Sequence, residues 1–128
     1  MRYLLDTNAL LFSWLESKAL SARARVIIEA SEQELYYSQA SLWEISLKHS
    51  TGKLPLPEAP RDYLPACIAR MSLERAAMTD EIIYRSAELV AHHKDPFDRV
   101  LIASAQVMSI PIISSDQFLN AYDIEVVW

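Results

Sequence analysis

Three acidic residues stand where apolar segments give way to predicted helices. Asp6 follows the run MRYLL, and Asp116 follows PIIS. Asp98 falls in the first turn of a helix predicted to begin at residue 96, within the stretch HHKDPFDR. In that stretch Asp95 is the predicted N-cap and Pro96 takes the first helical position. Because helix starts attract carboxylates as caps and through the helix dipole, each acid has a structural explanation when taken alone.

A fourth acid, Glu44, lies inside a helical pattern in SLWEISLK. Carboxylates are rarely buried without a partner. Lys48 follows at i+4, where an ion pair contributes roughly a few tenths of a kcal/mol to a helix. A surface ion pair with Lys48 is therefore the structural alternative for Glu44.

Taken together, the four acids predict a metal site. The carboxyl ends of parallel strands meet at one edge of a sheet, where α/β proteins bind their ligands. Asp6 and Asp116 are expected to point into that crevice, with Asp98 on the same rim and Glu44 reaching it from a helix. Repulsion raises the pKa of clustered carboxylates unless cations neutralise them. Mg²⁺ and Mn²⁺, which prefer oxygen ligands, are the candidate cations.

The elements that position these acids alternate between strands and helices. Apolar runs predict four strands, at residues 1–5, 35–38, 111–114 and 124–128. A spacing near 3.6 residues predicts five helices, at residues 8–16, 21–32, 39–50, 79–92 and 96–109. This alternation predicts a three-layer α/β/α sandwich with a central, mainly parallel sheet of four to five strands.

Punctuating residues refine this pattern. Gly52 is expected to end the helix at 39–50. Ser21 is expected to be the N-cap of the helix at 21–32. Three prolines make residues 53–60 an extended connection. A helical pattern at 61–71 contains Pro65, and residues 72–78 fit neither period clearly.

Length and composition favour a single globular domain over residues 1–128. No apolar run reaches the roughly 18 to 20 residues of a membrane span. Asp6 interrupts the N-terminal apolar run, so we expect no signal peptide. The single cysteine, Cys67, cannot form an internal disulfide, which favours a cytoplasmic location. The net charge of −5 argues against a nucleic-acid partner, but four acids held in a metal site would leave only −1 elsewhere.

Four motifs that contain these acids resemble a known family. They are LLDTNALL, SLWEISLKHSTGKLPLP, HHKDPFDRVLIASA and ISSDQFL, in this order over nearly the whole chain. The chain resembles the PIN-domain ribonucleases, specifically the VapC-type toxins of bacterial toxin–antitoxin pairs. The resemblance implies a PIN-like sandwich whose four acids bind Mg²⁺ or Mn²⁺, namely Asp6, Glu44, Asp98 and Asp116. Asn8 and Ser114 match supporting polar positions, although many family members carry threonine in place of Ser114.

The activity that the resemblance implies is hydrolysis of RNA phosphodiesters by an endoribonuclease, on structured RNA such as tRNA. One or two metals would activate a water, and one carboxylate would accept its proton, although the sequence does not say which. Four basic residues near the site acids in sequence could contact phosphates, although solvated surface is at least as good an explanation for each: Lys48, Lys53, Lys94 and Arg99. We attribute His92 and His93 to a solvated helix end, and His49 and Cys67 to structural roles.

The resemblance also implies a small antitoxin as partner, and homodimerisation is common in the family. Trp14, Trp43 and the KLPLP segment are candidates for the antitoxin interface, with core packing or a simple connection as the more frequent explanation. Two other functions remain. A small-molecule phosphohydrolase would need a glycine-rich phosphate loop or an aspartyl nucleophile motif, and the first is absent because the chain has one glycine. A non-catalytic RNA- or protein-binding module with the same fold would be favoured by a missing acid, and none is missing.

Overall fold

Five short strands form one parallel sheet, described over residues 1–128 in a computed structural model. The sheet order is β3-β2-β1-β4-β5. The strands are β1 (Arg2–Leu5), β2 (Glu34–Ser38), β3 (Glu74–Ala76), β4 (Ile112–Ile113) and β5 (Val126–Val127). In the central strand β1, Leu4 lies opposite Tyr36 of β2 and Ile112 of β4. The predicted parallel α/β architecture is confirmed, with five strands.

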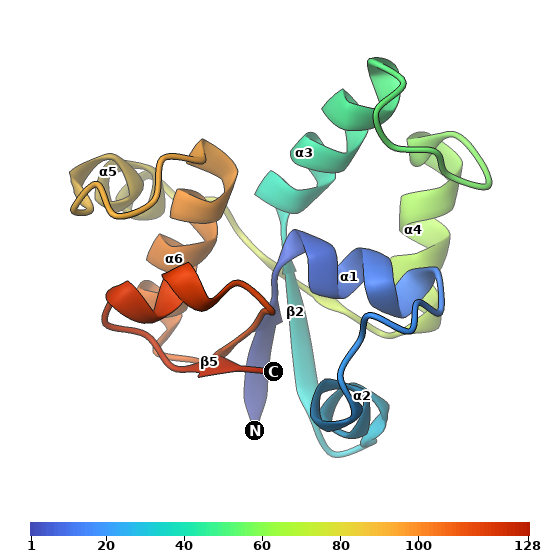
Figure 1. Cartoon of the computed structure of the whole chain (residues 1–128), viewed down its shortest axis with the longest axis horizontal. Helices are drawn as coiled ribbons and strands as arrows, with labels where there is room; N and C mark the ends of the chain where they lie inside the picture. Colours follow the sequence, from blue (N-terminus) through green and yellow to red (C-terminus); the bar gives the residue numbers. More distant parts are fainter.

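Helices cover both faces of this sheet, as Figure 1 shows. They are α1 (Thr7–Trp14), α2 (Ala22–Glu29), α3 (Gln39–Ser50), α4 (Pro60–Arg70), α5 (Asp80–Glu88) and α6 (Pro96–Met108), with a short 3₁₀ helix η1 (Gln117–Ala121). Successive residues of a strand point to opposite faces. Tyr3 and Leu5 accordingly pack into the core that α1 to α4 cover, whereas Leu4 packs into the core under α6 and η1. The three-layer sandwich follows from this alternation.

Polar caps fix where the helices begin. The side chains of six N-cap residues accept backbone N–H groups, those of Asp6, Ser21, Ser38, Thr79, Asp95 and, at η1, Asp116. The predicted caps at Ser21 and Asp95 are confirmed. Gly52 follows the C-cap of α3 with φ of +75°, a conformation that glycine adopts readily, as its predicted role requires.

Two stretches differ from the sequence-based expectation. The helix expected over 79–92 ends at Glu88, and residues 89–95 form a loop. The guanidinium of Arg99 donates hydrogen bonds to five carbonyls around this loop, those of Ser86, Ala87, Leu89, Val90 and His93. Two of these carbonyls, those of Ser86 and Ala87, would have been paired within a helix that continued to residue 92. Residues 72–78 contain the edge strand β3, which at three residues is too short to show a period.

Other ends shift by a few residues. The helix expected over 21–32 ends at Glu29, and the last strand is only Val126–Val127. The helix expected at 61–71 forms as α4 and continues through Pro65. No helix combines the length and the apolar character that crossing a membrane requires.

Candidate active site

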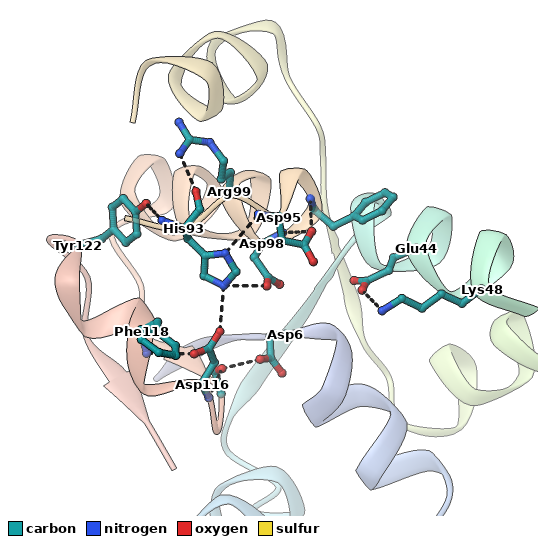
Figure 2. A network of polar contacts seen from close by, with 12 residues as sticks. Asp6, Glu44, Lys48, His93, Asp95, Asp98, Arg99, Asp116, Phe118 and Tyr122 are labelled. Carbon is teal, nitrogen blue, oxygen red and sulfur yellow. Dashed lines mark hydrogen bonds and ion pairs between the residues drawn. The ribbon is translucent and has the colours of Figure 1, made fainter. Parts of the chain in front are cut away.

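The four predicted acids line one small cavity at the carboxyl ends of the strands. The cavity has a volume of about 130 Å³ and no hydrophobic lining. It is lined by Asp6, Thr7, Asn8, Glu44, Lys48, Asp95, Asp98 and Asp116. Figure 2 shows the acids arriving from separate parts of the chain around a common space. Parallel strand order brings Asp6 and Asp116 together, because β1 and β4 are neighbours and both end at this edge. Glu44 and Asp98 reach the same edge from α3 and α6.

Asp6 is buried directly after β1, where it caps α1. Its Oδ1 accepts a hydrogen bond of 2.7 Å from the backbone N–H of Ala9, and its Oδ2 accepts one of 2.5 Å from the Ser114 hydroxyl. Burial raises the pKa of Asp6 to about 6, against the lowering effect of these two hydrogen bonds. The nearby charges of Asp116 and Glu44 raise this pKa further. The capping role and the place in the cavity are therefore combined in one side chain.

Asp98 stands in the first turn of α6 and is partly buried. Asp95, the N-cap, accepts hydrogen bonds from the backbone N–H groups of Phe97 and Asp98 at 2.9 and 3.4 Å. The backbone of Asp98 is thereby fixed while its carboxyl group faces the cavity. Burial raises the pKa of Asp98 to about 7, with a further rise from the charge of Asp95 and an opposing effect of His93. The two acids of HHKDPFDR therefore have different roles. Asp95 caps α6, and Asp98 lines the cavity.

Glu44 forms the ion pair with Lys48 that its spacing suggests, but it does so in a buried position. The distance from Lys48 Nζ to Glu44 Oε2 is 2.5 Å, and the glutamate side chain is only 6% exposed. This hydrogen bond raises the pKa of Lys48. Glu44 Oε1 is buried and has no hydrogen-bond partner. A surface ion pair is therefore the wrong description, since half of the carboxylate remains unsatisfied beside the cavity.

Asp116 caps η1 and also contacts a histidine. Its Oδ1 accepts the backbone N–H of Phe118 at 2.9 Å, and its Oδ2 lies 3.0 Å from His93 Nε2. The same nitrogen lies 3.1 Å from Asp98 Oδ2 (Figure 2). Ligand atoms of His93, Asp98 and Asp116 all lie within 4.8 Å of one another, the spacing at which side chains can share a metal ion.

Sequence reasoning missed His93. We expected a solvated helix end, and this is wrong because α5 ends at Glu88 and the following loop turns the His93 ring inward, leaving it 17% exposed. The available signal was its place two residues before the N-cap Asp95, close to an expected site acid. His92, by contrast, is exposed and packs edge-on against Tyr122.

The other candidate residues divide between the site, the surface and the core. Asn8 lines the cavity with its side chain exposed, and buried Ser114 bonds Asp6. Lys53 and Lys94 are exposed. Arg99 is wrong as a phosphate contact, because its guanidinium is occupied by the carbonyls of the loop.

Of the candidates for a partner interface, Trp14 is buried in the core and Trp43 is 56% exposed. Trp43 packs edge-on against Phe97, with ring centres 5.2 Å apart. Leu54 and Leu56 of KLPLP pack against the core, which explains that segment structurally. His49 and Cys67 also have structural surroundings. His49 Nδ1 lies 3.0 Å from the Leu54 carbonyl oxygen, and Cys67 is buried.

Comparison with known proteins places this geometry in a family. Residues 3–125 match the PIN domain. No curated protein matches the sequence.

Solved structures share the fold at low sequence identity. One is VapBC2 from Rickettsia felis, which was solved bound to a DNA fragment from the VapBC2 promoter. It is 14% identical with a TM-score of 0.73, and the match covers 100% of this chain and 99% of that chain. A toxin–antitoxin complex from Klebsiella pneumoniae is 18% identical with a TM-score of 0.68, covering 98% and 96%. FitAcB from Neisseria gonorrhoeae is 18% identical with a TM-score of 0.62, and the match covers 98% of this chain and 96% of that chain.

Proposed function

Because the chain belongs to the PIN domain family, we propose that it is a Mg²⁺- or Mn²⁺-dependent endoribonuclease and the VapC-type toxin of a toxin–antitoxin pair. PIN domains are generally nucleases and typically use divalent metal ions. One observation carries the metal-dependent activity. Four acids from separate elements line one cavity, namely Asp6, Glu44, Asp98 and Asp116. The proposal includes a single domain over residues 1–128 and a cytoplasmic location.

The donor set fits a hard divalent cation. Every proposed ligand is a carboxylate, the ligand type that Mg²⁺ and Mn²⁺ prefer. The buried Oε1 of Glu44 has no partner, so it retains a free acceptor beside the cavity. Burial and mutual repulsion raise the pKa of Asp6 and of Asp98, and a bound cation would offset both effects. These features support a metal between the four acids.

The proposed reaction is attack of water on an RNA phosphorus with loss of the leaving ribose oxygen. When bound, the metal lowers the pKa of the attacking water and neutralises charge on the phosphate oxygens. Asp6, Glu44, Asp98 and Asp116 would hold it. Ser114 orients Asp6 through its hydroxyl, and Asp95 fixes the helix turn that carries Asp98. One carboxylate accepts the proton of the attacking water.

An RNA substrate, including structured RNA such as tRNA, is compatible with the distribution of charge. The formal charge of −5 is concentrated in part at the cavity, where metal binding would cancel it. Exposed Lys53 and Lys94 are available to contact phosphates. Phe118, 75% exposed and two residues from Asp116, offers an aromatic face on which a nucleobase can stack.

We propose an antitoxin as the protein partner, with Trp43 in its binding surface. Trp43 lines an apolar cavity of about 350 Å³ together with Ile83, Phe97 and Val100, and it is the residue before Glu44. An antitoxin segment seated here would cover the rim of the acidic cavity. Trp43→Ala is expected to weaken the complex by about tenfold or more in calorimetry, because truncating a central interface tryptophan costs about 2 kcal/mol or more. Val26→Ala, at an exposed position on α2 that does not line this cavity, is the control. We also propose a homodimer, which light scattering of the purified protein tests.

The deciding experiment is cleavage of labelled RNA by the purified, antitoxin-free protein with Mn²⁺ and with EDTA. Asp6→Asn removes the charge while asparagine still caps α1. Asp80→Asn makes the same change at an exposed helix start outside the cavity. We expect cutting that requires Mn²⁺, is lost in Asp6→Asn and persists in Asp80→Asn. Failure of the folded protein to cut total RNA and individual tRNAs would contradict the proposal and favour a non-catalytic binding module.

A further inference from the structure

His93 makes hydrogen bonds through both its backbone and its ring, although it belongs to a loop. Its backbone N–H donates to the Tyr122 hydroxyl at 2.8 Å, and its carbonyl accepts from Arg99 Nη1 at 2.9 Å. Its ring lies between Asp98 and Asp116, from two different elements. A loop residue anchored through both its backbone and its ring is built to hold one position.

The hydrogen bonds of the ring identify which nitrogen carries the proton. The backbone N–H of Asp95 points at His93 Nδ1 over 3.3 Å, so Nδ1 acts as the acceptor. A neutral imidazole with a lone pair on Nδ1 carries its hydrogen on Nε2. That N–H faces Asp116 Oδ2 at 3.0 Å and Asp98 Oδ2 at 3.1 Å (Figure 2). One donor is thus shared by two carboxylates that would otherwise repel each other.

We propose that His93 is a positioning residue, whose shared Nε2–H holds Asp98 and Asp116 at metal-binding distance without itself binding the metal. The proposal rests on the metal site of the proposed function and adds a residue to it. The three side chains are close enough for His93 to be a third ligand instead. Ligation through Nε2 would require a lone pair there and a proton on Nδ1, which would then face the Asp95 N–H as a second donor. The Asp95 backbone therefore opposes ligation.

Nuclear magnetic resonance of the ring nitrogens tests this tautomer directly. The protein has three histidines, and His93→Gln identifies the His93 signals. Spectra are compared without metal and with saturating Mg²⁺, at about pH 8, above the ordinary histidine pKa of about 6.5. We expect the Nε2–H form in both states. Loss of the Nε2 proton on Mg²⁺ binding would show ligation and overturn the proposal.

Mn²⁺ affinity, measured by calorimetry, tests the positioning role. His93→Leu removes the donor, and His93→Gln keeps an amide N–H near the place of Nε2. Changes to residues that orient metal ligands typically reduce affinity about 10- to 100-fold. We expect a loss of that size in His93→Leu and recovery of most of it in His93→Gln. Equal affinity in all three proteins, or equal loss in both variants, would refute positioning through the donor.

Failure of this proposal differs from failure of the proposed function. A wild-type protein that binds no Mn²⁺ and cuts no RNA contradicts the metal-dependent nuclease itself. A wild-type protein that binds Mn²⁺ with Nε2 deprotonated contradicts only the role of His93. Should His93→Leu not fold, the wild-type spectra and His93→Gln still decide the outcome.

Discussion

The Ser114 hydroxyl donates a hydrogen bond to Asp6 Oδ2 at 2.5 Å, joining the ends of β4 and β1 across 108 positions of sequence. The same Ser114 oxygen accepts the backbone N–H of Asp116 at 3.0 Å. One buried hydroxyl therefore fixes the side chain of one site acid and the backbone of another. This link gives a small polar residue, and not an apolar one, a structural role directly after β4.

Ser114→Ala is expected to destabilise the metal-free protein by about 1–3 kcal/mol, because Asp6 Oδ2 loses its donor in a buried position. It should also raise the pKa of Asp6 further, since the hydroxyl now lowers it. Urea unfolding measures the first effect. Ser115→Ala, at the exposed neighbouring position, is the matched control. Equal stability of the two variants would show that the bond is not significant.

Asp98→Asn is expected to abolish RNA hydrolysis while the fold is retained. The amide keeps the size of the side chain but removes the negative charge proposed to hold the metal. Asp95, which caps α6, is untouched, so the helix start remains intact. Cleavage assays and circular dichroism together check this outcome. A well-folded variant that cuts RNA at the parent rate would refute the proposed role of Asp98.

Mg²⁺ or Mn²⁺ is expected to raise the melting temperature, because the folded state alone gathers the four carboxylates. A ligand at about 100 times its Kd stabilises the folded state by about 2.7 kcal/mol, which corresponds to a rise of several degrees. Scanning calorimetry with millimolar metal or EDTA gives the shift. Glu44→Gln should reduce it, whereas Glu88→Gln, an exposed change on α5, should not. An unchanged melting point in the wild type would count against the site.

The free energy of unfolding of the metal-free protein is expected to fall as the pH rises through the raised pKa values of Asp6 and Asp98. Burial raises the pKa of Asp6 to about 6 and that of Asp98 to about 7, above the ordinary 3.8. The folded state then binds more protons than the unfolded state between about pH 4 and pH 7, so unfolding becomes easier as the pH increases. This stabilising contribution is present near pH 4 and lost by about pH 7.

Asp98→Asn isolates one part of that dependence, because asparagine does not titrate. Urea unfolding at several pH values should show the variant gaining stability relative to the wild type as the pH rises. The gain should be on the order of a few kcal/mol, since each unit of pKa shift corresponds to about 1.4 kcal/mol. A difference between the two proteins that stays constant from pH 4 to pH 8 would contradict the raised pKa of Asp98.

Phe118→Ala is expected to raise the KM for RNA more than it lowers kcat. Stacking of a base on an aromatic ring contributes about 1–3 kcal/mol to binding, which corresponds to a KM increase of about 5- to 150-fold. Tyr84→Ala is the matched control, since Tyr84 is 61% exposed on α5 and does not line the acidic cavity. Steady-state kinetics on a defined RNA measure KM for the wild type and for both variants. A KM of Phe118→Ala identical to that of the wild type would exclude Phe118 from substrate binding.

Local chemistry made much of the site predictable. Asp95 and Pro96 are recognisable as a helix start from two residues, and Asp98 follows at a fixed offset in the first turn. The pattern of strand, acid and helix at Asp6 likewise needed no tertiary information. Residues 89–92 were different, because the helical pattern continued past Glu88, where α5 ends. Arg99, from the next helix, draws the carbonyls of this stretch into a loop, which no local period encodes.

The sequence by itself determined the parallel sandwich and the helix caps at Ser21 and Asp95, because apolar period and capping are properties of neighbouring residues. It also singled out the four acids that line one cavity. Only the tertiary structure decided that Glu44 is buried with one oxygen unpaired. It also decided that Arg99 donates hydrogen bonds to the carbonyls of a loop, and that His93 Nε2 lies between Asp98 and Asp116. These features depend on contacts between residues far apart in the chain, and on the burial that such contacts create. Packing of the sheet edge therefore assigns roles that residue type and spacing leave open.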